Sequence, residues 1–473
     1  MAKIVLTAEP GGNLPPLVDS HAHLDDPRFA DDLEEVLARA TAAGVRHILT
    51  VGANIDTSRA ALSLAESHPQ IYAAVGIHPH DAKDATGAAF AELEETARTH
   101  PKVVAIGETG LDFFYDLSPR EVQERVFREQ LRLARRLDLP VIIHDRDAHE
   151  DILRVLQEEA GQERYRGVLH CFSGDRAFAR RCLDLGFYLS FAGPLTYPKN
   201  EELRAVVAET PAERLLVETD CPYLAPQKHR GKRNEPAFVR ATAAKVAALK
   251  NLSMEDLSRI TCRNTALLFG IGKCDQAASI AYTIRDSLYL NITNRCTNAC
   301  VFCAKFHDFT VKGHFLKLDR EPSVAEVMEA IGDPRRFREI VFCGYGEPLL
   351  RLDLVLEIAR RLKKEGVRVR VNTDGQANLV HGRNILPELA GLVDALSVSL
   401  NAHDAETYRR ITRSPYGDAA FQAVQDFIVA AQEHIPDITA SVVTFPNVNV
   451  EAARKLVEEL GVKFRVRQYQ EAR

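Results

Sequence analysis

Between Leu17 and about Gly272, eight short apolar segments alternate with stretches whose apolar residues recur at helical spacing. The predicted strands are residues 16–24, 45–52, 71–80, 103–112, 140–147, 167–174, 186–193 and 214–220. Strands that alternate with helices in this way build a parallel sheet. Eight such units in roughly 250 residues predict a closed (β/α)8 TIM barrel, whose active site lies at the carboxyl ends of the strands.

The chain has 473 residues, which is too long for one ordinary domain. Residues 273–286 show no clear period, so we expect them to link a first domain, residues 1–272, to a second, residues 287–473. The strand pattern resumes in the second domain, at residues 288–293, 339–348, 367–375, 395–401, 438–445 and 463–469. Six strands in a shorter domain predict a partial (β/α)6 barrel, and the fold class of the whole chain is α/β.

The charge of the chain is uneven. Residues 1–272 hold 33 Lys and Arg against 40 Asp and Glu, a net charge of −7, and the remainder carries +1. A protein that coats DNA regardless of sequence needs a strongly basic surface, so an acidic first domain that cuts nucleic acid should hold few nucleotides.

The sequence has neither an apolar leader at its start nor a stretch near the ~18 to 20 apolar residues of a membrane span. Three of the nine cysteines stand close together in a metal-binding pattern, which indicates a reducing compartment. We therefore expect a cytoplasmic protein with no membrane partner.

Residues of the types that bind metals stand at the ends of the predicted strands. His21 and His23 project to the same side of an extended chain. Further candidates follow the fourth, fifth, sixth and eighth strands: Glu108, His144, His170 and Asp220. A single His-x-His pair is weak evidence, but a barrel brings all six to one rim. Four imidazoles and two carboxylates can hold two divalent ions, which favour displacement at phosphorus.

Seven segments of the first domain resemble the TatD family of metal-dependent hydrolases, in order: VDSHAHLDD, GIHPHDA, IGETGLDFFYD, VIIHDRDAH, HCFSG, LLVETDCPYLAP and GKRNEPAFV. The resemblance implies two divalent ions of the Mg, Mn or Zn type. One would be bound by His21, His23, Glu108 and Asp220, and the other by Glu108, His144 and His170. Glu108 would bridge the ions and Asp220 would accept the proton of the attacking water.

TatD proteins are usually described as deoxyribonucleases that trim DNA from the 3′ end, which implies nucleic acid ends or a small phosphodiester as substrate. Candidate substrate-binding residues are Arg146, His78, His80 and Arg233, the last in a cluster with Arg230 and Lys232. A structural role is an equally good explanation for that cluster. Asp145 is an unusual neighbour for His144, and a carboxylate there could repel phosphodiesters.

The second domain contains Cys296, Cys300 and Cys303 in a loop, with spacing C-x3-C-x2-C. Three thiolates so close together suit a [4Fe-4S] cluster that keeps one iron open. Zinc is the alternative, with His307 or His314 as a fourth ligand. Cys343 lies in an apolar strand, where we expect it to be part of the core.

This loop, with Phe302 before its last cysteine, resembles the radical S-adenosylmethionine (radical SAM) superfamily. GYGEP resembles the segment that receives the amino group of S-adenosylmethionine. The resemblance implies cofactor-binding roles for Gly344, Gly346, Glu347, Pro348, Asn372, Ser399 and Asn401, although loop capping explains the last three equally well. It also implies an external reductant such as flavodoxin or ferredoxin.

We therefore predict a bifunctional enzyme, a dinuclear-metal hydrolase of ester bonds joined to a domain that cleaves S-adenosylmethionine reductively. Two alternatives remain. The same metals could hydrolyse an amide or acyl ester, or one half could be a non-catalytic binding module.

Overall fold

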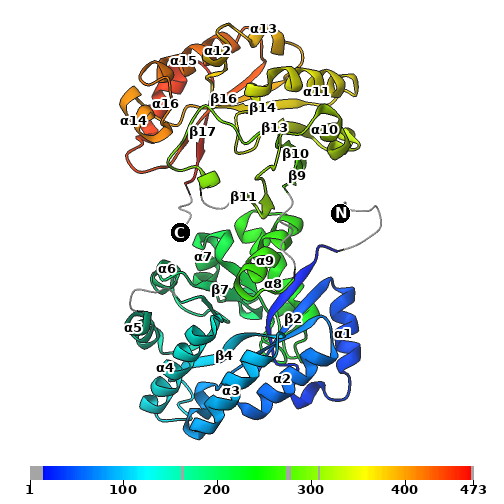
Figure 1. The fold of residues 1–473 in the computed structure, drawn as a ribbon, viewed down its shortest axis with the longest axis vertical. Helices are drawn as coiled ribbons and strands as arrows, with labels where there is room; N and C mark the ends of the chain where they lie inside the picture. Colours follow the sequence, from blue (N-terminus) through cyan, green and yellow to red (C-terminus); the bar gives the residue numbers. More distant parts are fainter. Residues whose placement is uncertain (1–13, 161–164, 273–277, 307–308, 470–473) are drawn as a thin grey trace. The chain divides into compact units, whose positions relative to one another are not determined.

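The computed structural model describes residues 14–160, 165–272, 278–306 and 309–469. These residues form two compact units, one before and one after residues 273–277 in the sequence. In Figure 1 the first unit is coloured from blue to green and the second from green to red. No helix among the described residues is long and apolar enough to cross a membrane.

The first unit is the predicted (β/α)8 TIM barrel. Its strands are β1 (Leu17–Ala22), β2 (Val45–Val51), β3 (Ile71–Val75), β4 (Val103–Asp112), β5 (Val141–Arg146), β6 (Gly167–Leu169), β7 (Tyr188–Phe191) and β8 (Leu215–Val217). They are parallel and are paired in sequence order. A parallel bridge between Ala22 and Cys221 joins the two ends of the sheet, and the amide of Asp220 donates to the carbonyl of His21 over 2.9 Å.

Helices alternate with these strands: α1 (Leu33–Ala42), α2 (Ile55–Ser67), α3 (Gly87–Thr99), α4 (Arg120–Leu137), α5 (His149–Ala160), α6 (Arg176–Asp184), α7 (Glu201–Glu209), α8 (Val239–Lys250) and α9 (Met254–Phe269). Their apolar sides pack on the sheet in one large core. A second core contains residues from all eight strands together with Leu268, Phe269 and Ile271. The end of α9 therefore packs against the barrel interior, as in a filled barrel rather than a pore.

The second unit contains a seven-stranded sheet. In sheet order its strands are β17 (Lys463–Arg467), β16 (Asp437–Val443), β15 (Ala395–Ser399), β14 (Val369–Thr373), β13 (Glu339–Phe342), β10 (Ser287–Leu290) and β9 (Ala281–Ile284). Six of these strands are parallel, namely β10, β13, β14, β15, β16 and β17, which confirms the predicted partial barrel. β9 is antiparallel to β10. A hairpin of β11 (Thr310–Val311) and β12 (His314–Phe315) lies outside this sheet.

The helices of this unit are α10 (Val324–Ile331), α11 (Leu352–Lys364), α12 (Ala377–His381), α13 (Leu386–Leu389), α14 (Ala405–Thr412), α15 (Ala419–Ala431) and α16 (Val450–Glu459). In β14, the buried Val369 and Val371 alternate with the half-buried Arg370 and Asn372. Because neighbouring residues of a strand face opposite sides, one side of the sheet joins the apolar core and the other carries polar groups.

The segment 273–286, expected to be a linker, is only partly a connection. Residues 281–284 form β9, which extends the sheet of the second unit by pairing with β10. The strand has only four residues, too few for a clear alternation of polar and apolar side chains. A domain boundary before β9 is therefore our proposal.

Candidate functional site

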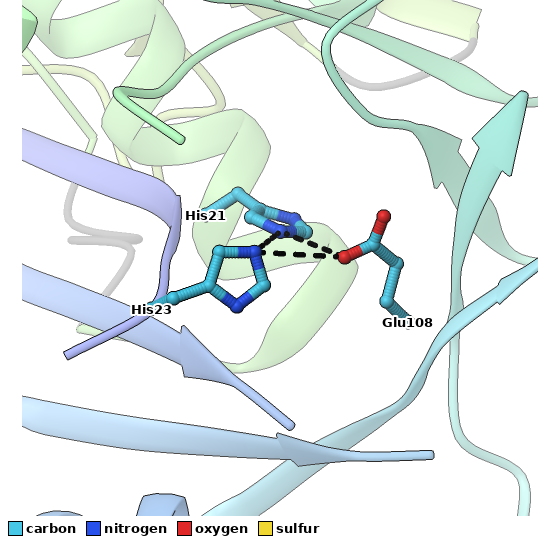
Figure 2. A group of neighbouring side chains, drawn as sticks. All are labelled: His21, His23 and Glu108. Atoms are coloured by element: carbon cyan, nitrogen blue, oxygen red, sulfur yellow. Dashed lines mark hydrogen bonds and ion pairs between the residues drawn. The ribbon is translucent and has the colours of Figure 1, made fainter. Parts of the chain in front are cut away.

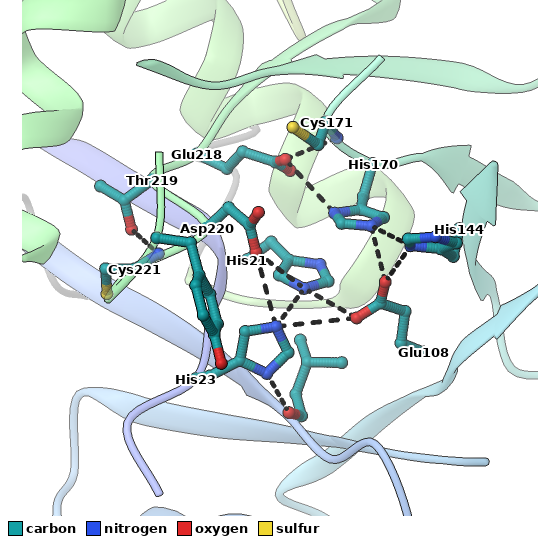
Figure 3. Close-up of polar contacts among 12 residues, drawn as sticks. His21, His23, Glu108, His144, His170, Cys171, Glu218, Thr219, Asp220 and Cys221 are labelled. Atoms are coloured by element: carbon teal, nitrogen blue, oxygen red, sulfur yellow. Dashed lines mark hydrogen bonds and ion pairs between the residues drawn. The ribbon is translucent and has the colours of Figure 1, made fainter. Parts of the chain in front are cut away.

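All six predicted metal ligands of the barrel stand at the carboxyl ends of its strands. They are His21 in β1, His23 just after it, Glu108 in β4, His144 in β5, His170 after β6 and Asp220 after β8. Figure 3 shows their side chains pointing toward one another. Buried ionisable groups in such number are costly unless they are paired or bind a metal.

Four of these side chains place one donor atom each around a common point. The Nε2 atoms of His21 and His23 lie 3.3 Å apart and 3.4 and 3.6 Å from Oε2 of Glu108 (Figure 2). Oδ1 of Asp220 lies 3.9 and 3.5 Å from the same two nitrogens. A tetrahedral ion with ligands at about 2.1 Å separates them by about 3.4 Å. This first donor set therefore fits a divalent metal ion.

A second donor set surrounds the other oxygen of Glu108. Its Oε1 atom lies 2.7 Å from Nδ1 of His144 and 2.7 Å from Nε2 of His170, and these nitrogens are 3.4 Å apart. Nε2 of His78 lies 3.5 Å from the same oxygen. The structure thus places His78, predicted as a substrate-binding residue, within reach of the second donor set. Each oxygen of Glu108 faces its own group of donors.

The charges in this site are mutually dependent. Burial alone would raise the pKa of Glu108, but the charges of His170 and His78 and the hydrogen bond with His144 hold it well below its usual range. Burial would lower the pKa of His23, whereas Asp220 and Glu108 raise it to about 9. The carboxylates and the imidazoles of His23, His144 and His170 therefore favour each other's charged forms. Divalent cations compete with protons for the same nitrogens, as expected of a metal site.

The predicted cysteine ligands of the second unit are half-buried in one loop, Cys296, Cys300 and Cys303. The amides of Ala299 and Val301 donate to the carbonyls of Thr412 and Ile411, each over 2.9 Å, and hold the loop against the end of α14. Three partly accessible thiols on an anchored loop fit the cysteine donors of an iron–sulfur cluster.

Of the two histidines considered as a zinc ligand, His307 lies outside the described residues. Nε2 of His314 lies 3.2 Å from the carbonyl oxygen of Thr283.

The GYGEP segment is tied to the end of β14. The carboxylate of the buried Glu347 accepts hydrogen bonds from the hydroxyl of Thr373 (3.0 Å) and from the amides of Leu349 (2.9 Å) and Asp374 (2.6 Å). A Cβ atom on Gly346 would collide with the carbonyl oxygens of Thr293 and Arg295. Only glycine fits at this contact, which brings the segment against the residues between β10 and Cys296.

The other predicted cofactor-binding residues have protein partners. Asn372 accepts a hydrogen bond from Arg370 over 2.8 Å, and Pro348 begins a short 3-10 helix that ends at Arg351. A guanidinium nitrogen of Arg467, a residue not predicted, lies 2.5 Å from Oδ1 of Asn401 and 3.4 Å from the hydroxyl of Ser399. Arg467 thus joins the ends of β15 and β17 on the polar side of the sheet.

Comparison with known proteins decides the family. Residues 18–270, more than half of the chain, match the family described as TatD related DNase. The chain belongs to the TatD family. Residues 290–460 match the radical SAM superfamily, so a TatD-type metal-dependent hydrolase domain is followed by a radical SAM domain.

Relatives with TatD domains are similar to the first unit along nearly their whole length. An uncharacterized metal-dependent hydrolase, YabD of Bacillus subtilis, is 47% identical over 255 residues, which are 54% of this chain and 99% of YabD. A 3′-5′ ssDNA/RNA exonuclease, TatD of Escherichia fergusonii, is 39% identical over 261 residues, which are 54% of this chain and 99% of that protein. The crystal structure of YJJV, a TatD homolog of Escherichia coli K12, aligns with a TM-score of 0.52 and 34% identity over 54% of this chain and 98% of YJJV.

Two buried carboxylates of the TatD domain were not predicted. Oδ2 of Asp112 lies 3.1 Å from Nε2 of His144 and 2.9 Å from Nε2 of His80. Oε1 of Glu218 accepts from the amide of Cys171 over 2.6 Å and lies 3.5 Å from Nδ1 of His170. Carboxylates behind ligating histidines typically fix the ring orientation. The sequence contains a signal for both carboxylates. Asp112 and Glu218 lie an even number of residues from the predicted ligands Glu108 and Asp220, and residues at even spacing in an extended strand project to the same side.

The cations predicted to meet the substrate have different surroundings. The guanidinium of Arg146 lies over the rings of Phe114 and Tyr115, 4.2 and 4.7 Å from their centroids. Arg233 donates two hydrogen bonds to the carboxylate of Asp32, over 2.8 and 2.6 Å. Arg146 is exposed at the end of β5, whereas Arg233 is held by an ion pair.

Asp145 was expected to place an extra carboxylate beside the metals. Its Oδ2 atom lies 2.7 Å from Nδ1 of His149, and Oδ1 accepts from the amide of Ala148 over 3.3 Å. The carboxylate is therefore engaged by the residues at the start of α5.

Proposed function

We propose that the TatD domain is a dinuclear-metal phosphodiesterase that acts on the ends of single-stranded nucleic acid. The observation that carries this proposal is the position of Glu108, whose two oxygens each face a separate set of donors. A carboxylate so placed can bridge two ions. Ions of the Mg, Mn or Zn type suit these nitrogen and oxygen donors. Such a pair supplies activation of water and neutralisation of phosphoryl charge.

The residues of the chain then have separate tasks. His21, His23, Glu108 and Asp220 would hold one ion, and Glu108, His144 and His170 the other. Asp220 follows the last strand, and its carboxylate would accept the proton of the attacking water.

The choice of a phosphodiester rests on the surroundings of the metals. Arg146 is an exposed guanidinium two residues after His144, and guanidinium groups bind phosphate well. The relative from Escherichia fergusonii is named an exonuclease of ssDNA and RNA. The net charge of −7 on residues 1–272 argues against a long duplex as substrate.

For the second domain, we propose that Cys296, Cys300 and Cys303 hold one [4Fe-4S] cluster. With S-adenosylmethionine and an external reductant such as flavodoxin or ferredoxin, such a cluster supplies reductive cleavage to a 5′-deoxyadenosyl radical. The protein positions the cofactor. The GYGEP segment, anchored through Glu347, and the polar residues Asn372, Ser399 and Asn401 would form the binding surface.

One assay separates these proposals from their alternatives. The metal-loaded protein is offered single-stranded oligonucleotides, aryl phosphodiesters, amides and acyl esters. Cleavage of phosphodiesters, lost in Glu108→Ala, is the expected result. Turnover of amides or acyl esters alone would overturn the phosphodiesterase proposal. Anaerobic incubation with S-adenosylmethionine and a reductant should release 5′-deoxyadenosine, and its absence would overturn the proposal for the second domain.

A further inference from the structure

Three large aromatic side chains are exposed on the site rim of the TatD domain. The side chains of Phe114, Tyr115 and Tyr223 are 56%, 53% and 49% exposed, although aromatic rings usually bury most of their surface. Each has an arginine over its face. Arg146 lies over Phe114 and Tyr115, and Arg28 lies 4.3 Å from the centroid of the Tyr223 ring. A guanidinium group is attracted to the face of an aromatic ring. The arginine therefore stabilises the exposed ring and places a positive charge beside it.

These rings lie on two sides of the donor atoms. On one side, Tyr115 meets the ring of His80 edge to face, with centroids 5.4 Å apart, and the His80 ring lies 6.3 Å from that of His144. On the other side, the ring of Tyr223 lies 6.2 Å from that of His23. One aromatic group therefore borders the second donor set, and the other borders the first.

Hydrogen bonds hold both groups beside the candidate ligands. Oδ1 of Asp112 accepts from the amides of Phe114 (3.1 Å) and Tyr115 (2.8 Å). The amide of Tyr223 donates to the carbonyl of Asp220 over 3.0 Å, and its hydroxyl donates to Asp26 over 3.3 Å. The backbone that carries the rings is thus anchored beside the candidate ligands, which reduces the cost of ordering the rings when a substrate binds.

We propose that the Phe114–Tyr115 pair and Tyr223 are stacking sites for unpaired nucleobases, one on each side of the scissile phosphate. This inference rests on the proposed function and extends it to the bases of the substrate. Aromatic rings bind bases irrespective of sequence, because every base offers a π-face, and arginine meets the adjoining phosphates. A base paired in a duplex cannot stack on these rings. The arrangement therefore selects single-stranded ends and requires a base on both sides of the cleaved bond.

The test compares two oligonucleotides on the full-length, metal-loaded protein. One is a short oligothymidylate, and the other has the same backbone with abasic tetrahydrofuran residues at its two 3′-terminal positions. The variants are Phe114→Ala, Tyr115→Ala and Tyr223→Ala, with Tyr115→Phe and Tyr223→Phe as conservative replacements. Leu267→Ala is the matched control, because Leu267 is 48% exposed on α9 and far in sequence from the rim.

Stacking on one ring typically accounts for about a tenfold change in affinity or more. Each alanine variant should therefore lower kcat/KM about tenfold on the normal end and leave kcat/KM on the abasic end unchanged. Tyr115→Phe and Tyr223→Phe should keep the wild-type value on both. Equal losses on both oligonucleotides, or no loss on either, would overturn the inference. Binding is measured separately by fluorescence anisotropy. Base-dependent binding without any cleavage would overturn the proposed function and leave the stacking sites standing.

Discussion

Oδ2 of Asp112 lies 3.1 Å from Nε2 of His144, while the other nitrogen of the same ring lies 2.7 Å from Oε1 of Glu108. The buried carboxylate thus fixes which edge of the imidazole faces the second donor set. Its other oxygen holds the amides of the aromatic segment after β4. One side chain therefore positions both a predicted metal ligand and the predicted stacking surface.

Replacing Asp112 should weaken the second metal site more than the first. Asp112→Asn keeps the size of the side chain but removes the charge behind His144, and such changes typically cost about 10- to 100-fold in metal affinity. Titration with Mn²⁺, followed by calorimetry, measures the two affinities. Asp145→Asn is the control, because that carboxylate is engaged by His149. Similar losses in both variants would contradict a positioning role for Asp112.

Substitution of the two acidic candidate ligands, Glu108 and Asp220, should change metal content and hydrolysis in different ways. Glu108→Ala removes the donor shared by both sets, so metal content should fall below two ions per chain and hydrolysis should be lost. Asp220→Asn leaves the second set intact. It should lower kcat by about 100-fold or more, and metal content by less, because the amide cannot accept a proton. Metal analysis and rates on an aryl phosphodiester give both numbers. Wild-type rates in Glu108→Ala would show that the site is elsewhere.

The sequence predicts the barrel well, and it places the six candidate ligands at strand ends, where the structure also has them, because both depend on short-range patterns. His21 and His23 are recognisable from their spacing, and Glu108, His144, His170 and Asp220 from their places at strand ends. By contrast, the ion pair of Arg233 with Asp32 joins residues about 200 positions apart, and no local pattern reports it.

Cys343 shows a different limit of the sequence. It follows an apolar strand and was expected in the core, but it is only half-buried. Burial of its thiol raises its pKa, whereas the neighbouring Asn372 and Arg370 oppose this rise. A strand in an open barrel has a polar side as well as an apolar one, and the apolar composition of residues 339–343 does not show which side the last residue takes.

The contact at Gly346 should be intolerant of any side chain. Gly346→Ala would push the GYGEP segment away from the carbonyls of Thr293 and Arg295, which lie between β10 and Cys296. We expect weaker binding of S-adenosylmethionine and a loss of stability of about 1–3 kcal/mol, as is typical of overpacking. Gly87→Ala is the control, since nothing lies within 4 Å of a Cβ built there. Denaturant unfolding and equilibrium dialysis measure the two effects; identical behaviour of both variants would contradict the role of the contact.

The three loop cysteines should be separable from Cys343 by their effect on the cluster. After anaerobic reconstitution with iron and sulfide, the wild-type chain should contain about four irons, with a reduced-state paramagnetic signal. Cys296→Ala, Cys300→Ala and Cys303→Ala each remove a thiolate from the single anchored loop, so each should abolish the cluster.

Cys343→Ala is the matched thiol control. It follows β13, outside that loop, and lies beside Asn372 and Arg370, so its loss should leave iron content and 5′-deoxyadenosine release intact. Reconstitution must precede the measurement, because thiolates in aerobic preparations also take up zinc. Tight stoichiometric zinc that persists through reconstitution, with neither cluster nor cleavage, would instead identify the loop as a zinc site. If Cys343→Ala instead lost the cluster while Cys303→Ala kept it, the third ligand would be Cys343 and not Cys303. That ligand would then lie on the polar side of the sheet, near Arg370.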